Sequence, residues 1–255
     1  MKILYLFFLF IIFSQLTSAG DTVEFIDLGK FTQKSINSII LNYDSTESIS
    51  GEFLGVPYLG HTLIGSNEKQ EILTINLSGM DCFTYIDYVE AIRNSTDYNG
   101  FKENVRKVRY KDGTVDYRKR NHFFSDWPVY NPSNVQDVTD IVGGKDSVTV
   151  NKYLNMKKDG SYFLPGIPVT ERKITYIPSG KLTPEIIGRI NSGDYIGIYS
   201  GLDGLDVSHT GIAIKKDGKA YLRHASSREK NRKVLDEELL LYMENKPGIV
   251  IYRPL

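Results

Sequence analysis

The sequence predicts an α+β fold, in which an N-terminal helix that begins at the single cysteine packs on a central antiparallel sheet. Two observations lead to this prediction. The only cysteine, Cys82, opens a stretch whose apolar residues fall at helical spacing. Residues 195–252 then hold short apolar runs separated by turn signals, which is typical of antiparallel strands.

The stretch around Cys82 reads as a strand, a turn and a helix. Residues 71–77 alternate loosely and end at a Ser-Gly pair, as a strand that enters a turn does. Asp81 stands where an N-cap belongs, so Cys82 is expected in the first helical turn. That position favours the thiolate, because free backbone N–H groups and the helix dipole stabilise negative charge. The alternative is an inert, buried cysteine.

Composition limits the possible functions. The 255 residues carry 31 Lys and Arg against 31 Asp and Glu, so the chain lacks the basic excess of a nucleic-acid-binding protein. We therefore expect no nucleic-acid partner. Seventeen tyrosines fit a β-rich core and surface better than a sugar-stacking cleft.

Residues 1–19 have the order of a secretory signal: Lys2, an apolar run over residues 3–13, and small residues up to Ala19. The run is too short to span a bilayer comfortably. We expect export across the inner membrane to the periplasm or cell envelope, with no membrane span after cleavage. Residues 20–255 would form one domain. A single cysteine in an oxidising compartment favours a working thiol.

The segments on either side of Cys82 differ in regularity. Residues 31–48 predict a helix, whereas the glycines and proline of residues 51–60 predict a structured loop. Tyr58 in that loop either packs or directs its hydroxyl into a site. Residues 98–108 predict an exposed helix, and residues from about 95 to 180 read as an inserted lobe rich in loops.

Within this lobe, residues 117–127 form a polar and aromatic cluster. It is either a basic turn beside a small hydrophobic cluster or a substrate platform. In the second interpretation guanidinium groups bind carboxylates and Trp127 stacks on a sugar. The candidate residues of this platform are Arg118, Arg120, His122 and Trp127.

The C-terminal third predicts a helix over 184–191 and strands over 195–199, 206–214, 219–224 and 249–252. A nucleophilic cysteine needs a base and a group that orients the base. His209 and His224 lie on two strands joined by a tight turn, so they are candidates for both roles. Ordinary strand histidines are one alternative. A zinc site with Cys82 is another, but no fourth ligand stands at a suitable spacing, and we expect no metal or cofactor.

The order of these motifs resembles the NlpC-type, papain-like cell-wall cysteine hydrolases. The motifs are Gly55-Val56-Pro57-Tyr58, Asp81-Cys82, Gly193-Asp194, Ser208-His209-Thr210-Gly211-Ile212 and His224-Ala225. The resemblance implies that Cys82 attacks an amide, that His209 is base and then acid, and that His224 orients His209. It places Tyr58 against the nucleophile near the oxyanion, and Asp81 and Ser208 in contact with the substrate peptide.

Two departures from that pattern match a subfamily. Phe83-Thr84 replace the usual Ser-Gly, and the interval from Cys82 to His209 is unusually long. Both features resemble the N-acetylmuramoyl-L-alanine amidase-like branch, which also shares the segment from Tyr117 to Trp127 and an acid at Asp87.

The resemblance implies a secreted cysteine amidase that hydrolyses the amide between N-acetylmuramic acid and L-alanine in peptidoglycan or muropeptides. The paired arginines and the indole favour this bond, because the first suit carboxylates and the second a sugar face. A γ-D-glutamyl-diamino acid endopeptidase on the same scaffold is the nearest alternative. A non-catalytic wall-binding module is another. We expect a monomer.

Overall fold

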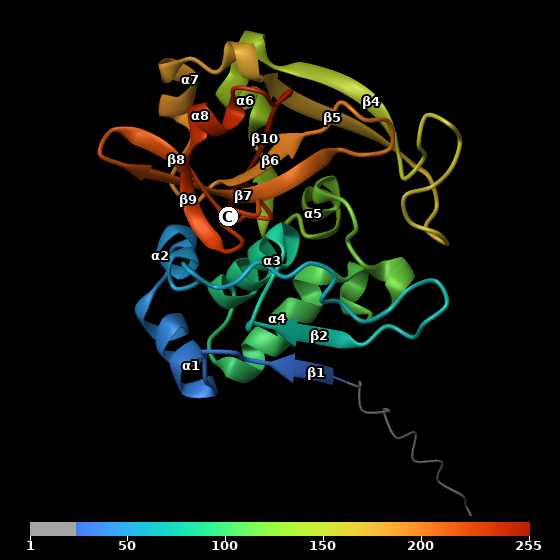
Figure 1. Ribbon diagram of the computed structural model, residues 1–255, viewed down its shortest axis with the longest axis vertical. Coiled ribbons are helices and arrows are strands. Elements are labelled where there is room, and N and C mark those ends of the chain that lie inside the picture. The colour runs from blue at the N-terminus through green and yellow to red at the C-terminus, as the bar shows by residue number, and fades with distance from the viewer. Residues whose placement is uncertain (1–23) are drawn as a thin grey trace, which may run out of the picture.

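A large antiparallel sheet carries helices on both faces (Figure 1). The computed structural model describes residues 24–255, so the predicted signal over residues 1–19 lies outside the described residues. Within the described part, no helix is long and apolar enough to cross a bilayer.

The helices and strands follow one another in mixed order. The strands are β1 (Glu24–Asp27), β2 (Leu73–Asn76), β3 (Val135–Asp137), β4 (Val148–Leu154), β5 (Thr170–Pro178), β6 (Tyr195–Tyr199), β7 (Val207–Lys216), β8 (Lys219–Ala225), β9 (Val234–Glu238) and β10 (Gly248–Pro254). The helices are α1 (Gln33–Asn42), α2 (Thr46–Gly51), α3 (Cys82–Arg93), α4 (Tyr98–Arg109), α5 (Trp127–Tyr130), α6 (Thr139–Gly143), α7 (Pro184–Arg189) and α8 (Leu239–Met243).

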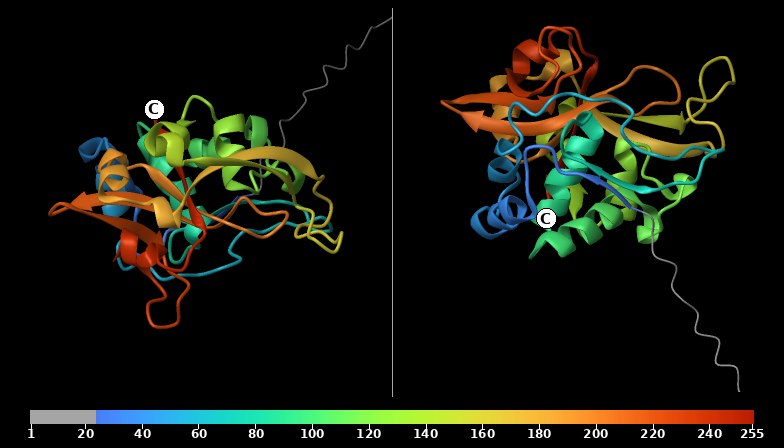
Figure 2. Two further views of the ribbon diagram at one scale, coloured as in Figure 1. Left: turned by 90° about the horizontal axis from the view of Figure 1, so that it is seen from above. Right: turned by 60° about the horizontal axis from the view of Figure 1, so that its bottom comes forward.

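The sheet runs in the order β4-β5-β10-β6-β7-β8-β9, and β3 pairs with the far end of β10. β1 and β2 form a separate parallel pair. Side chains alternate between the two faces along a strand, and in the central strands the side chains on both faces are apolar. On β6, for example, Tyr195 enters one hydrophobic core, whereas Ile196 and Ile198 enter the other. An antiparallel sheet with two buried faces needs helices on both sides, and Figures 1 and 2 show them.

The helices divide between these two cores. α1 to α4 pack beneath the sheet as drawn in Figure 1, and α6, α7 and α8 cover the opposite face. α3 lies against β7 and β8, and α4 packs along α3. The helix that begins at Cys82 therefore packs on the central antiparallel sheet, as predicted.

One sequence prediction of a helix was wrong in detail. The single helix expected over residues 31–48 is two helices, because Tyr43 is extended and Ser45 caps a new helix by accepting from the Ser48 N–H. The inserted lobe expected over residues 95–180 stays a prediction, and its elements contact the rest of the domain. Its β5 pairs with β10, and its α4 packs on α3, so the segment extends both layers of the fold.

Candidate active site

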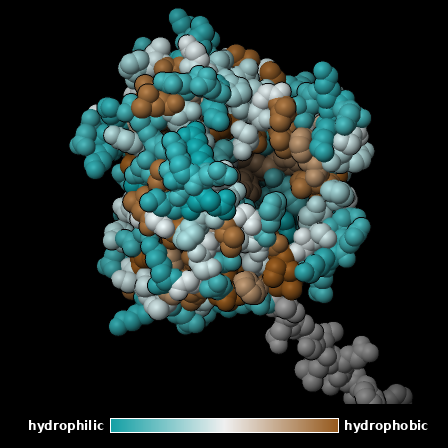
Figure 3. Space-filling view, in the orientation of Figure 1, coloured by the Kyte–Doolittle hydropathy of each residue, from teal (hydrophilic) through white to brown (hydrophobic). Residues whose placement is uncertain are grey.

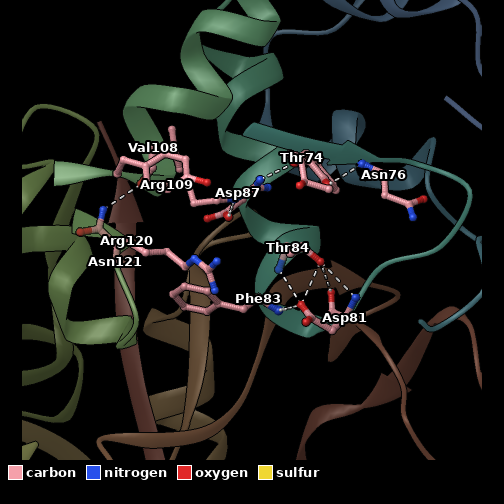
Figure 4. A network of polar contacts seen from close by, with 12 residues as sticks. Thr74, Asn76, Asp81, Phe83, Thr84, Asp87, Val108, Arg109, Arg120 and Asn121 are labelled. Carbon is pink, nitrogen blue, oxygen red and sulfur yellow. Dashed lines mark hydrogen bonds and ion pairs between the residues drawn. The ribbon is translucent and has the colours of Figure 1, made fainter. Parts of the chain in front are cut away.

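Cys82 is the first residue of α3, as the sequence predicted. The N-cap is Asp81, whose Oδ1 accepts from the N–H groups of Phe83 (3.0 Å) and Thr84 (2.8 Å). The Thr84 hydroxyl in turn accepts from the Asp81 N–H at 3.0 Å, which completes a capping box. Figure 4 shows these contacts at the start of α3, with Asp87 and Arg109 paired deeper along the helix. The cap fixes the backbone that presents the thiol.

The environment of the Cys82 thiol favours its protonated form. Burial, followed by the negative charge of Asp81, raises its pKa to about 11. The N–H and hydroxyl of Thr210 act in the opposite direction by favouring the thiolate. The expected lowering of the pKa by the helix N-terminus is therefore wrong for the free protein, because desolvation of the charged sulfur outweighs the dipole.

β7, the strand that carries His209, is bonded to the start of α3. The hydroxyl of Thr210, the next residue on the strand, donates to the Cys82 carbonyl oxygen at 2.8 Å. Burial lowers the pKa of His209 to about 4, and the positive charges of Lys246 and Arg228 act in the same direction. His209 is therefore neutral at pH 7, as a base must be.

His209 and His224 are in direct contact, as predicted from the hairpin. His209 Nε2 lies 2.7 Å from His224 Nδ1, and His224 Nε2 lies 2.9 Å from Glu237 Oε2 on β9. The other oxygen of Glu237 accepts from Arg228 at 2.8 Å. The three side chains form a chain that runs from the base to an anchored carboxylate.

This chain determines the tautomer of each neutral ring. Burial lowers the pKa of His224 to about 3, so both imidazoles are neutral. A carboxylate can only accept, so His224 carries its proton on Nε2 and accepts at Nδ1. His209 must then donate from Nε2, which leaves its Nδ1 as the basic nitrogen.

The same contact argues against the zinc alternative. The facing nitrogens of His209 and His224 share one proton, and the remaining nitrogen of His224 donates to Glu237. The pair therefore cannot direct two lone pairs at one ion without rearranging. Within residues 24–255, no group of three or more His, Cys, Asp or Glu side chains is placed to hold a metal.

Tyr58 lies near the start of α3, where Cys82 stands. Its backbone N–H donates to the Arg232 carbonyl oxygen at 2.9 Å, and it forms a bridge with Met80, two residues before Cys82. Burial and the charges of Cys82 and Asp81 raise the pKa of its hydroxyl. Ser208 is exposed next to His209, and among residues 24–255 its hydroxyl makes a single long contact, of 3.4 Å, with the Ile198 carbonyl oxygen.

The predicted substrate platform of residues 117–127 is corrected at two residues. Trp127 is only 1% exposed, and its ring packs 5.1 Å from Tyr195 and 6.1 Å from Phe83, centroid to centroid, so it presents no face to a sugar. Arg120 is bonded through Nη2 to both oxygens of the buried Glu71, at 2.7 and 2.6 Å. Its guanidinium is therefore already occupied by a carboxylate of the protein.

The other two platform residues differ from each other. His122 contacts the Tyr117 carbonyl oxygen at 2.8 Å, and burial lowers its pKa to about 4. Arg118 is exposed and reaches Asn67 at 3.2 Å. Of the four, only Arg118 offers an exposed charge.

Comparison with known proteins supports an assignment at the level of the family. Residues 48–249 match the AmiA-like family, described as N-acetylmuramoyl-L-alanine amidase-like. The chain belongs to this family. No curated protein matches the chain.

Solved structures show the same relationship. An N-acetylmuramoyl-L-alanine amidase from Bacteroides uniformis ATCC 8492 is 28% identical, with a TM-score of 0.71 over 83% of this chain and 99% of that one. A putative xylanase from Bacteroides fragilis is also 28% identical, with a TM-score of 0.66 over 81% and 99%. Protein LPG0564 from Legionella pneumophila, at 24% identity and a TM-score of 0.73 over 88% and 94%, shares the fold.

In this amidase-like chain, sequence reasoning missed several residues around the site. Glu237 has no motif around it and reaches His224 only because β9 pairs with β8. Tyr242 on α8 lies with its ring 5.1 Å from His224 and 6.2 Å from His209, and burial raises its pKa to about 12. Thr210 stands next to His209, inside the motif quoted from the sequence. Its contact with Cys82 depends on how α3 packs on β7.

Proposed function

We propose that the protein is a cysteine amidase with a papain-like, NlpC-type fold that hydrolyses the amide between N-acetylmuramic acid and L-alanine in peptidoglycan or muropeptides. The observation that carries the proposal is the series of side-chain contacts from His209 through His224 to Glu237. It lies on a sheet whose β7 is bonded, through the Thr210 hydroxyl, to the carbonyl oxygen of Cys82 at the start of α3. The family description and the Bacteroides uniformis amidase support the choice of bond.

The proposed reaction begins with proton transfer. Nδ1 of His209 takes the Cys82 proton as sulfur attacks the lactyl carbonyl carbon, and the hydroxyl of Tyr58 lies near the developing oxyanion. The imidazolium then gives its proton to the leaving nitrogen of L-alanine, so the C–N bond breaks and a thioester remains. Water activated by the same nitrogen hydrolyses the thioester and restores the thiol.

The resting state follows from the pKa values. With Cys82 near 11 and His209 near 4, the free protein holds a thiol and a neutral imidazole. The ion pair is therefore formed during the reaction. Glu237 stabilises the positive charge on the histidine pair, since an anion close to a developing cation lowers its energy.

The substrate side of the proposal includes Asp81, Ser208 and Arg118. Oδ1 of Asp81 is used by the helix cap, so its Oδ2 is the atom that would contact the peptide. Ser208 is exposed beside the proposed base, and Arg118 is exposed on the short 3-10 helix of residues 117–119. His122 would act through its packing against Tyr117, at 4.9 Å between ring centroids.

Mass spectrometry on a muramyl tripeptide tests the choice of bond. The proposed amidase releases a tripeptide with a free L-alanine N-terminus, and Cys82→Ala protein, folded as judged by circular dichroism, releases none. Release of the free diamino acid with muramyl dipeptide left would identify an endopeptidase instead. A wall-binding module would release no product from the muropeptide, and it would bind the muropeptide equally well before and after alkylation of Cys82.

The location is also proposed from the sequence. We expect export across the inner membrane and a mature chain that begins at Gly20, because peptidoglycan lies outside that membrane. Edman sequencing of the protein from a periplasmic fraction would show Gly20 first. An intact Met1 in a cytoplasmic fraction would contradict export. Sedimentation analysis tests the expected monomer.

A further inference from the structure

The loop between β8 and β9 brings basic residues to the candidate site. Residues 226–233 connect the strands, and four of them are basic: Arg228, Lys230, Arg232 and Lys233. The loop is tied to the segment that carries Tyr58. The Tyr58 N–H donates to the Arg232 carbonyl oxygen at 2.9 Å, and Pro57 forms a bridge with Lys233. These bonds fix the loop beside the candidate nucleophile.

Arg232 differs from the other arginines near the site because its charge is unpaired. Arg228 binds Glu237 at 2.8 Å, and Arg223 binds Asp236 at 2.7 Å. Arg232 is exposed and, within residues 24–255, has no carboxylate partner. Its one side-chain hydrogen bond, to the Tyr58 carbonyl oxygen, is long at 3.5 Å. The guanidinium therefore retains most of its donors.

The position of Arg232 is nevertheless well defined. Its guanidinium carbon lies 5.3 Å from the centre of the Tyr58 ring, a cation–π arrangement. Its backbone is left-handed, with φ of 40°, and both of its backbone polar groups are bonded. The N–H donates to the Arg228 carbonyl oxygen at 2.9 Å, and the carbonyl oxygen accepts from the Tyr58 N–H. Tyr58 is also an electrostatic neighbour of Cys82. An open guanidinium is thus held on the residue that flanks the thiol.

We propose that Arg232, supported by the Tyr58 ring, forms a subsite for a carboxylate of the stem peptide. This inference rests on the proposed function and specifies its substrate. A guanidinium binds a carboxylate through two parallel hydrogen bonds, which an amide cannot reproduce. In a muropeptide the D-glutamate is linked through its side chain, so its α-carboxylate is free close to the scissile bond. Arg232 replaces Arg120, which Glu71 occupies, in the predicted role of carboxylate binder.

The test compares two substrates that differ only in that group: N-acetylmuramoyl-L-alanyl-D-glutamate and its D-isoglutamine counterpart, in which the carboxylate is an amide. Wild-type protein should have a kcat/KM about 10- to 100-fold higher for the acid, the size expected of a charged hydrogen bond. Arg232→Gln should lose that preference because its kcat/KM falls for the acid and stays the same for the amide. Lys230→Gln is the matched control, because Lys230 is exposed on the same loop and makes no side-chain hydrogen bond or ion pair in the described chain.

Binding separates this inference from the proposed function. Calorimetry with Cys82→Ala protein should show the same preference for the acid, and the Cys82→Ala, Arg232→Gln double variant should show none, whether or not the wild type hydrolyses either compound. An Arg232→Gln variant that weakens both compounds equally would reduce Arg232 to a structural role and overturn the inference. Equal affinity of the Cys82→Ala protein for acid and amide would also overturn it.

Discussion

Burial acts in opposite directions on the two residues that would exchange a proton. It raises the pKa of Cys82 and lowers that of His209, since each loses solvation of its charged form. The neutral pair is therefore the stable resting state. The groups that would stabilise the charged pair are Thr210 beside the sulfur and Glu237 behind the histidines.

This order of pKa values predicts the pH profile. His209 must be unprotonated to accept a proton, so activity is lost only as the pH falls through its lowered pKa of about 4. We expect kcat/KM for a muramyl peptide to stay nearly constant from pH 6 to 8 and to fall below pH 5. The measured value belongs to the coupled pair of groups. An acid limb centred near 6.5, the ordinary histidine value, would contradict it.

Glu237 is predicted to act through the histidines. Glu237→Leu removes both the acceptor and the charge, so kcat should fall about 10- to 100-fold while KM changes little, and Glu237→Gln should lose less because it keeps an acceptor. Nitrogen-15 NMR of the ring nitrogens should show His209 protonated on Nε2 in the wild type and mixed in Glu237→Leu. Glu238→Gln is the control, since Glu238 pairs with Lys219. An unchanged kcat in folded Glu237→Leu protein would refute the role.

The N-terminus of α3 contains a carboxylate that affects both the helix and the Cys82 thiol. Asp81 caps the helix, and the same carboxylate opposes ionisation of the next residue. The helix dipole and the Asp81 charge thus act on the thiol in opposite directions. Burial, the largest effect, adds to that of Asp81, and the two together keep the thiol protonated.

Asp81 can be compared with Asp97, which caps α4 by accepting from the Gly100 N–H at 2.7 Å. Asp81→Ala and Asp97→Ala should each lower the free energy of unfolding by about 1 kcal/mol, the usual contribution of an N-cap. Only Asp81→Ala should speed alkylation of Cys82, because it removes a negative charge that raises the thiol pKa. Urea unfolding and iodoacetamide kinetics at pH 8 measure the two effects. Equal alkylation rates in both variants would contradict this.

The segment between Cys82 and His209 contributes strands to the main sheet and side chains to the core. β4 and β5 widen the sheet, and the hairpin that they form projects from one end in Figure 2. The face in Figure 3 is hollowed beside α5, with hydrophobic residues in its depth. Trp127, at the start of α5, belongs to the core that joins α3 to β6.

The burial of Trp127 predicts a structural effect. Trp127→Ala should lower the free energy of unfolding by about 3–5 kcal/mol, because it leaves a large cavity. Val129→Ala on the same helix is the control and should change it by about 0.5 kcal/mol or less, since Val129 is 51% exposed. Urea unfolding compares the two. A fully stable Trp127→Ala protein with weakened muropeptide binding would instead support the interpretation that Trp127 stacks on a sugar.

Local sequence patterns were enough to predict most elements and the central residues of the candidate site. Helical spacing after Asp81 predicted α3 with Cys82 at its start, and turn signals predicted β6, β7 and β8 nearly to the residue. His209 and His224 could be brought together from a single hairpin, because a tight turn constrains which residues meet.

The other features of the site could not be predicted, because they depend on contacts between residues distant in the chain. Glu237 contacts His224 because β8 pairs with β9. Arg120 forms an ion pair with Glu71, 49 positions away in the chain, so its guanidinium is not free to bind a substrate. Trp127 is buried by side chains of α3 and β6. The pKa of Cys82 follows the same rule: the helix start is visible in the sequence, but the desolvation that outweighs it comes from the packed surroundings.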